Sequence, residues 1–324
     1  MSLAKTLAKG LAIVGACLTA ILCSSCSSKD DAIVLGFSQA GMQGIWRTAN
    51  TESIKEAAEK SGIQLHFTDA GSEQEEQIVA IRSFIAQRVD VIAFTPVVET
   101  GWDAILREAK KAGIPVVLTE RAVQVSDRSL YTTMLGSDFV EQGRQAGAWL
   151  TQNILGRSGE ARIIELAGPE GSLLSRDRAR GFREVIATDP YFQIVRSAAG
   201  DFTRAGGKAA MKTLLAAEGR NKFKVVFAHN DEMALGAIQA LEEARLRPGE
   251  DIIIISVDGI RGAFEAMVAG KLNVTVESNP LIGPQLMGVV KDVIAHRRLP
   301  HRLVVQEFVF PKELAAETLP TRKY

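Results

Sequence analysis

Two planar polar side chains, the amide of Asn230 and the carboxylate of Asp258, each follow a short apolar segment of the chain. The segments, 224–228 and 252–257, are rich in β-branched residues and too short for buried helices, which predicts two strands. An amide and a carboxylate held close together can hydrogen-bond adjacent hydroxyl groups of one small polyhydroxylated molecule. The competing interpretation is local: Asn230 and Asp231 cap a helix, and Asp258 begins a turn.

The residues between these two strands predict a helix, because Met233, Ile238 and Leu241 recur at helical spacing and Asp231 offers an N-cap. A strand–helix–strand unit makes the two strands parallel, and strands that are apolar on both sides indicate a sheet buried on both faces. Ligands of such sheets bind just beyond the carboxyl ends of the strands. Asn230 and Asp258 are therefore expected to lie at one edge of one sheet.

The same arrangement recurs along the chain, where polar or aromatic residues follow other predicted strands or begin helices. These candidates are Trp46, Arg47, Glu120, Arg121, Asp138, Arg176, Asp177, Arg178, Phe202 and Glu277. Each has a purely structural alternative: Trp46 and Phe202 could pack in the core, Asp138 could cap a helix, and the cluster 176–178 could be an exposed charged face. The functional interpretation rests on their shared position at one edge of the sheets.

Strands and helices are predicted to alternate from residue 32 to the C-terminal region, and the pattern starts again near residue 140. This predicts an α/β protein with two doubly wound lobes. Among the predicted details are a helix that begins at Ser72 with a capping box completed by Glu75, and a strand over 304–309. No fixed-period repeat suggests a solenoid.

Motifs for catalysis are scarce in this sequence. It contains no GxSxG, HExxH, CxxC or phosphate-binding GxxxxGK[ST] pattern, and its four histidines are scattered. We therefore expect no enzyme, no cofactor and no metal site. Lysine plus arginine and aspartate plus glutamate both number 38, so the zero net charge of the whole chain argues against nucleic acid or an acidic membrane surface as a partner.

The first 25 residues resemble an export signal. Lys5 and Lys9 form a basic start, and residues 11–22 form an apolar stretch too short to span a membrane comfortably. All three cysteines, Cys17, Cys23 and Cys26, precede residue 27. Small residues, a cysteine and a polar tether over 26–31 resemble a bacterial lipoprotein signal lipidated at Cys26. Lipidation at Cys17 and cleavage that leaves a soluble periplasmic product are the alternatives.

Several long segments carry a resemblance to a known family. VFAHNDEMALGAIQAL with its following SVDG resembles the periplasmic sugar-binding proteins of the ribose and galactofuranose type. GFSQAGMQGIWRTANTESIKEAAEKSGI, SFIAQRVDVIAFTPVVETGWDAILREAKKAGIPVV and GDFTRAGGK are most similar to the galactofuranose-binding branch. The resemblance covers about residues 32–312. It implies a type I periplasmic binding protein, in which two Rossmann-like lobes are joined by three crossovers, here near residues 136–137, 277–278 and 308. The N-terminal lobe would comprise 32–137 and 278–307, and the C-terminal lobe 138–277 and 308–324.

By the same resemblance, a sugar would contact a defined set of side chains between the lobes. The set is Gln39, Trp46, Arg47, Glu120, Arg121, Asp138, Arg176, Phe202, Asn230, Asp258 and Glu277. Arg121 and Arg176 would clamp ring and hydroxyl oxygens, and Trp46 and Phe202 would sandwich the ring. The chain departs from the family pattern at Glu120, where the family usually has Asp, and at Phe139, where Asn is common.

The resemblance implies a monomeric, lipid-anchored substrate-binding component of an ABC sugar importer in the periplasm or cell envelope. It would bind a galactofuranose-like or galactose-like aldose and would deliver it to a membrane permease with its ATPase. The alternative is a sensor that presents bound sugar to a chemoreceptor or histidine kinase. A sugar-responsive transcription regulator shares the lobe architecture, but an export signal stands where it needs a DNA-binding helix-turn-helix.

Overall fold

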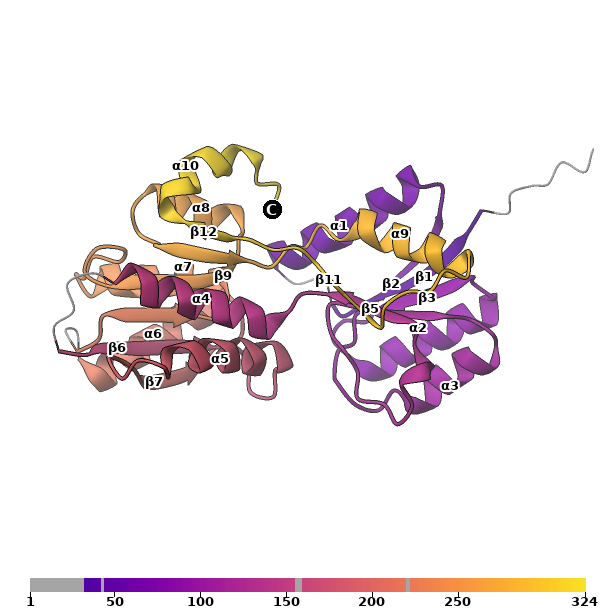
Figure 1. Cartoon of the computed structure of the whole chain (residues 1–324), viewed down its shortest axis with the longest axis horizontal. Helices are drawn as coiled ribbons and strands as arrows, with labels where there is room; N and C mark the ends of the chain where they lie inside the picture. Colours follow the sequence, from indigo (N-terminus) through magenta and orange to yellow (C-terminus); the bar gives the residue numbers. More distant parts are fainter. Residues whose placement is uncertain (1–31, 42–43, 155–158, 220–221) are drawn as a thin grey trace, which may run out of the picture. The chain divides into compact units, whose positions relative to one another are not determined.

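The computed structural model describes residues 32–41, 44–154, 159–219 and 222–324. The expected signal, tether and lipidated Cys26 lie outside these residues. Ile33–Tyr324 forms one compact unit. Two six-stranded sheets, named sheet A and sheet B, organise this unit (Figure 1).

Sheet A has the strand order β11-β5-β4-β3-β1-β2, and all of its strands are parallel. Its strands are β1 (Val34–Gln39), β2 (Gln64–Asp69), β3 (Val91–Phe94), β4 (Val116–Thr119), β5 (Thr133–Gly136) and β11 (Arg302–Val304). On one face α1 (Ile45–Lys60) packs against α9 (Gly283–Ile294), and on the other α2 (Gln74–Gln87) packs against α3 (Asp103–Lys111). The middle strands are buried on both faces, as parallel sheets require.

Sheet B repeats this order as β12-β10-β9-β8-β6-β7, with β12 as an antiparallel edge strand. Its strands are β6 (Ala161–Ala167), β7 (Phe192–Ala199), β8 (Val225–Ala228), β9 (Ile253–Asp258), β10 (Val274–Glu277) and β12 (Val309–Pro311). Its helices are α4 (Phe139–Asn153), α5 (Leu173–Ile186), α6 (Arg204–Glu218), α7 (Asp231–Glu243), α8 (Arg261–Val268) and the short α10 (Ala315–Thr318). In both sheets the order reverses beside the first strand, which is where ligands of doubly wound folds bind.

The predicted fold class, two doubly wound lobes with three crossovers, is confirmed. The chain passes between the sheets in the segments 137–138, 278–282 and 305–308. The predicted strand over 304–309 is wrong, because β11 ends at Val304 on sheet A and β12 begins at Val309 on sheet B. The residues between them form the third crossover. The finer lobe boundaries given above stay predictions.

Two predicted helix starts are also wrong. Helix α2 begins at Gln74, and Ser72, with a φ of 70°, donates its hydroxyl to the carbonyl of Ala40 instead of capping the helix. Asp231 is the first residue of α7, and Asn230 is the residue that caps it. Over the described ranges, no helix combines the length and apolar character that crossing a membrane requires.

Candidate functional site

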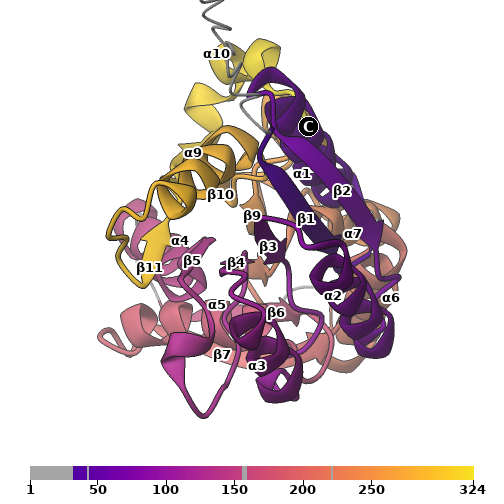
Figure 2. The same cartoon turned by 90° about the vertical axis from the view of Figure 1, so that its right-hand side faces the viewer.

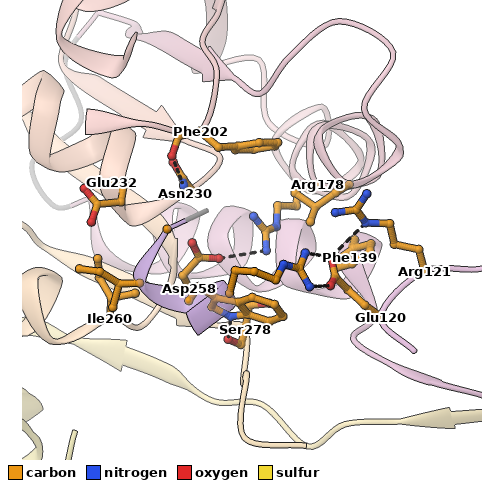
Figure 3. A pocket seen from close by; sticks show the side chains of 15 residues that line it. Glu120, Arg121, Phe139, Arg178, Phe202, Asn230, Glu232, Asp258, Ile260 and Ser278 are labelled. Atoms are coloured by element: carbon orange, nitrogen blue, oxygen red, sulfur yellow. Dashed lines mark hydrogen bonds and ion pairs between the residues drawn. The ribbon is translucent and has the colours of Figure 1, made fainter. Parts of the chain in front are cut away.

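A cavity of about 180 Å³ is lined by residues at the carboxyl ends of strands in both sheets (Figure 3). At about 30 Å³ for each molecule of liquid water, this volume corresponds to about six water molecules. Seven of the eleven predicted site residues line it. They are Trp46, Arg47, Glu120, Arg121, Phe202, Asn230 and Asp258. The sequence therefore predicted most of the polar lining of this cavity.

The sheet A side of the cavity is organised around the carboxylate of Glu120, which follows β4 and is 6% exposed. Its oxygens accept hydrogen bonds from both Nη atoms of Arg47 and, at 3.0 Å, from Nε of Arg121. Burial alone would raise the pKa of Glu120, but the two guanidinium groups outweigh burial and lower it to about 2. Glu120 is therefore a permanently charged acceptor whose arginines are held in fixed positions.

Gln39 lies behind this cluster rather than on the cavity wall. Its amide nitrogen donates to Asn50 and Thr51, and its oxygen accepts from Nη1 of Arg47 at 3.1 Å. Trp46 lies beside Arg47, whose guanidinium stands 5.0 Å from the indole centroid, and the indole nitrogen donates to the carbonyl of Ser278. Gln39 thus positions Arg47, and Trp46 links α1 to the second crossover.

The sheet B side is organised around Arg178 on α5, which is 1% exposed. Its guanidinium donates to Gln142 at 2.8 Å, to the carbonyl of His229, and to the carboxylate of Asp258 at 3.3 Å. This arrangement depends on a close approach of α4 and α5. A Cβ at Gly181 would lie 1.8 Å from the carbonyl oxygen of Val140, so only glycine allows the contact.

Asp258 ends β9 with a φ of 128°, a strained value for a residue with a side chain. Burial raises its pKa to about 8; Arg178 opposes this effect and the nearby carboxyls of Asp231 and Glu120 reinforce it. The carboxylate of Asp231 holds the loop after β9, because it accepts hydrogen bonds from the backbone N–H groups of Gly259 and Ile260 at 2.6 and 2.8 Å. Asp231 thus fixes the strained turn that presents Asp258.

Asn230 has two roles, because it caps helix α7 and also lines the cavity. Its side-chain oxygen accepts from the N–H of Met233 at the start of α7, and its nitrogen donates to the carbonyl of Phe202 at 3.0 Å. The Phe202 ring occupies the place of a Cβ at Gly168, so that glycine makes room for it. One donor hydrogen and one acceptor lone pair of Asn230 stay free of these two bonds.

Comparisons with known proteins agree with this geometry. Residues 35–297 match the model of a periplasmic binding protein domain. The galactofuranose-binding protein YtfQ of Escherichia coli is 40% identical over 90% of this chain and 92% of its own length. The chain belongs to the periplasmic binding protein family. Its recognisable branch is the ribose and galactofuranose type, as the sequence predicted.

Solved structures of this family superpose closely on the chain. A Mycobacterium smegmatis protein in complex with β-D-fucofuranose has a TM-score of 0.85 and 49% identity, over 90% of this chain and 96% of that one. The binding-protein component of an arabinose ABC transporter from a Shewanella species, bound to α- and β-L-arabinofuranose, has a TM-score of 0.84 and 45% identity, over 90% and 95% of the two chains.

Arg176, predicted to contact the ligand of this periplasmic binding protein, does not line the cavity. Its side chain is 61% exposed and lies 3.4 Å from Glu99, beside a second hollow of about 590 Å³ that shares Arg121, Leu174 and Phe202 with the first. Arg178 occupies the cavity instead. The phase of α5 explains the exchange, because its buried residues recur at three- and four-residue spacing through Arg178 and not through Arg176.

Two predicted carboxylates are also absent from the cavity wall. Asp138 caps α4 by accepting the N–H of Glu141, and it lies 3.6 Å from Arg302. Glu277 accepts a hydrogen bond from Nη1 of Arg322 at 2.6 Å and another from the hydroxyl of Tyr324. Both groups already have structural partners.

The cavity of this binding protein also includes residues outside the predicted ligand set, among which only Arg178 was a candidate from its position at a helix start. These are Gly44, Ile45, Phe139, Leu174, Arg178, Glu232, Ile260 and Ser278. Glu232 is 20% exposed and paired with Arg204 at 2.9 Å. Several of them could have been predicted from their place in the sequence. Ile45, Phe139, Glu232 and Ile260 each lie at the start of a helix that follows a predicted strand.

A serine, a histidine and a glutamate form a buried string beneath the cavity. Ser175 Oγ lies 2.8 Å from Nδ1 of His229, whose Nε2 lies 3.2 Å from Glu165. Burial lowers the pKa of His229 although Glu165 opposes it, so the ring is neutral. All three side chains are buried and the serine also accepts the N–H of Gly168, so the string supports the wall rather than presenting a nucleophile. Over the described ranges, no group of three or more His, Cys, Asp or Glu is placed to hold a metal ion.

Proposed function

We propose that this protein is the substrate-binding component of an ABC sugar importer and that its ligand is a monosaccharide in the furanose ring form. The support is twofold. The relatives at 40–49% identity bind galactofuranose, β-D-fucofuranose or L-arabinofuranose. The cavity has the size and the polar lining that a single sugar of five or six carbons needs.

The observation that carries the proposal is the convergence of three carboxyl groups and three arginines on one small cavity (Figure 3). Sugar hydroxyls donate and accept hydrogen bonds at once, so they need acceptors such as Glu120 beside donors such as Arg121 and Arg178. Trp46 and Phe202 offer apolar faces for the C–H side of the ring. Burial of these polar groups makes a missing or misplaced hydroxyl costly, which gives specificity.

The wider transport role follows from the family. The protein would work in the periplasm or cell envelope as a monomer, held by lipid at Cys26, and its two lobes would close on the sugar before it meets the permease and ATPase. Fatty-acid labelling should mark the wild-type chain and leave Cys26→Ser unlabelled. Labelling of both would place the lipid elsewhere.

Isothermal titration calorimetry against D-galactose, D-fucose, L-arabinose, D-ribose and D-fructose tests the ligand class. We expect at least one aldose to bind near micromolar affinity, about 8 kcal/mol. An absence of heat from every sugar would defeat the proposal. Loss of the gene should abolish uptake of the sugar that binds, whereas retained uptake with lost signalling would favour the sensor alternative.

A further inference from the structure

The opposite edge of sheet A, where its strands begin, carries exposed cations that the cavity does not use. Arg88 follows α2, Lys110 and Lys111 end α3, and Arg297 and Arg298 follow α9. All five are exposed, and we call them the basal surface. Figure 2 turns this side of sheet A, with α2, α3 and α9 around it, toward the viewer.

Two adjoining hollows are lined by three of these five residues. A hollow of about 660 Å³ is lined by Lys110, His296 and Arg297, and a neighbouring one of about 520 Å³ is lined by Arg88. Both hollows share Asp90, together with Gly113 and Ile114. Arg88, Lys110 and Arg297 therefore border one continuous depression, and Lys111 and Arg298 are their neighbours in the chain.

The positive charge of the basal surface is only partly neutralised. Asp127 lies 3.5 Å from Lys110, Asp292 lies 2.7 Å from Arg297, and the exposed Asp90 lines both hollows. In the part of the chain that the structure describes, Arg88, Lys111 and Arg298 form no ion pair. Basic residues often end helices because they complement the helix dipole, and this accounts for Lys110 and Lys111. It also applies to Arg88, the C-cap of α2, but not to Arg297 and Arg298, which lie three and four residues beyond the end of α9.

The folded unit begins at this same edge. The N–H of Val34, the first residue of β1, donates to the carboxylate of Asp90 at 2.7 Å, and Asp90 lines both hollows. Val34 lies eight residues after Cys26 in the sequence, with seven residues between them. Even a fully extended segment of that length reaches at most about 29 Å. A lipid at Cys26 would therefore keep the basal surface within a short distance of the bilayer.

We propose that the basal surface binds anionic phospholipid headgroups of the membrane to which the chain is tethered. A lipid chain and a cluster of basic residues together give firmer membrane attachment than either gives alone. The cavity lies at the carboxyl-terminal edge of sheet A, away from the edge that would meet the lipid. The cavity would therefore stay accessible to solute while the protein rests on the membrane. The inference depends on the anchor in the proposed function but not on the identity of the sugar.

Sedimentation with lipid vesicles tests this surface. The chain without its export signal and with Cys26→Ser suits the assay, because Ile33–Tyr324 is a compact unit by itself. It is mixed with vesicles of phosphatidylcholine alone or of phosphatidylcholine with phosphatidylglycerol, at low and at physiological salt. We expect binding to the anionic vesicles only, and weaker binding as salt rises, because salt screens exposed charges.

A matched pair of variants separates the basal surface from overall charge. The basal variant combines Arg88→Glu, Lys111→Glu and Arg298→Glu. The control combines Arg245→Glu, Lys312→Glu and Lys323→Glu, which are exposed residues near sheet B, and includes an arginine with positive φ as the basal set does.

The basal variant should bind anionic vesicles at least about tenfold more weakly, and the control should change by less than about twofold. Equal losses in the two variants, undiminished binding by the basal variant, or equal binding to neutral vesicles would overturn the proposal. Thermal midpoints and sugar calorimetry show that both variants are folded. Binding to anionic vesicles without binding to any sugar would refute the proposed ligand class but would support the proposal that the basal surface binds lipid.

Discussion

Glu120 and Asp258 occupy equivalent places in the two sheets, at the carboxyl ends of β4 and β9, and both have positive φ values, 65° and 128°. Their surroundings differ. Glu120 is bound by two arginines, Arg47 and Arg121, whereas Asp258 has Arg178 alone and is affected by the carboxyls of Asp231 and Glu120. The same fold position therefore holds a carboxylate in one lobe and a readily protonated carboxyl in the other.

The difference gives the two sides of the cavity separate chemical tasks. Glu120, with a pKa of about 2, can only accept hydrogen bonds at neutral pH. Asp258, with a pKa raised to about 8 by burial, can donate as well as accept. A sugar hydroxyl that bridges the two sides would then find a fixed acceptor on sheet A and an adaptable partner on sheet B.

The largest expected effect comes from removing the arginine of sheet B. Arg178→Ala would leave Asp258 and the carbonyl of His229 without their buried partner, so we expect a loss of about 4 kcal/mol of unfolding free energy and no measurable sugar binding. Arg176→Ala, two residues away and exposed, should cost less than about 1 kcal/mol and leave affinity unchanged. Urea unfolding and calorimetry on both variants check this. A larger loss of stability or affinity in Arg176→Ala than in Arg178→Ala would refute the assignment of Arg178 to the cavity.

Removal of the charge on sheet A should have the next largest effect. Glu120→Gln would leave Arg47 and Arg121 without a buried counter-charge, which we expect to cost about 3 kcal/mol of unfolding free energy. Glu108→Gln breaks an exposed pair with Arg82 and serves as the control, with an expected cost below about 1 kcal/mol. Equal unfolding midpoints for the two variants in urea would contradict the interpretation that Arg47 and Arg121 hold Glu120 as a charged carboxylate.

The corresponding change on sheet B should affect binding more than folding. Asp258→Asn keeps an oxygen for Arg178 and tolerates positive φ, so at about pH 4, where the carboxyl of Asp258 is also neutral in the folded chain, stability should change by less than about 1 kcal/mol. Sugar affinity should fall about 100-fold, or about 2.7 kcal/mol, because the carboxyl would no longer match the hydroxyls. If Asp258→Asn bound sugar as tightly as the wild type, Asp258 would not be a ligand contact.

The two carboxyls should also give stability opposite pH dependence. The pKa of Asp258 is higher in the folded chain than in the unfolded chain. Its contribution to the free energy of unfolding is therefore present at low pH and is lost as pH rises from about 4 to about 8. A lowered folded pKa means that Glu120 contributes stability above about 4.5 that is lost as pH falls toward 2. The free energy of unfolding of the wild type minus that of Asp258→Asn should therefore decrease as pH rises, by at most about 1.4 kcal/mol per pH unit. A flat difference across this range would show that Asp258 ionises normally.

Much of this architecture could be predicted from local patterns. Short apolar segments alternating with helical spacing indicated two doubly wound lobes, and the rule that ligands meet strand ends selected Glu120, Asn230 and Asp258. The phase of a helix decided between Arg176 and Arg178, and the buried positions of α5 contained that information.

Other features depend on contacts between distant residues and were not predictable. Glu277 is occupied by Arg322 and Tyr324, which lie 45 and 47 residues further along the chain. The apolar segment around Val304 and Val309 contains both strand ends and a crossover, because its two ends join different sheets. No local pattern distinguishes that arrangement from one continuous strand.

A crystal structure of the protein with the aldose that gives the strongest calorimetric signal tests the central claim most directly. The account predicts a single furanose ring in the cavity, with Glu120 and Arg121 on one side of it and Arg178, Asn230 and Asp258 within hydrogen-bond distance on the other. A sugar bound elsewhere, or one that contacts only a single lobe, would contradict it.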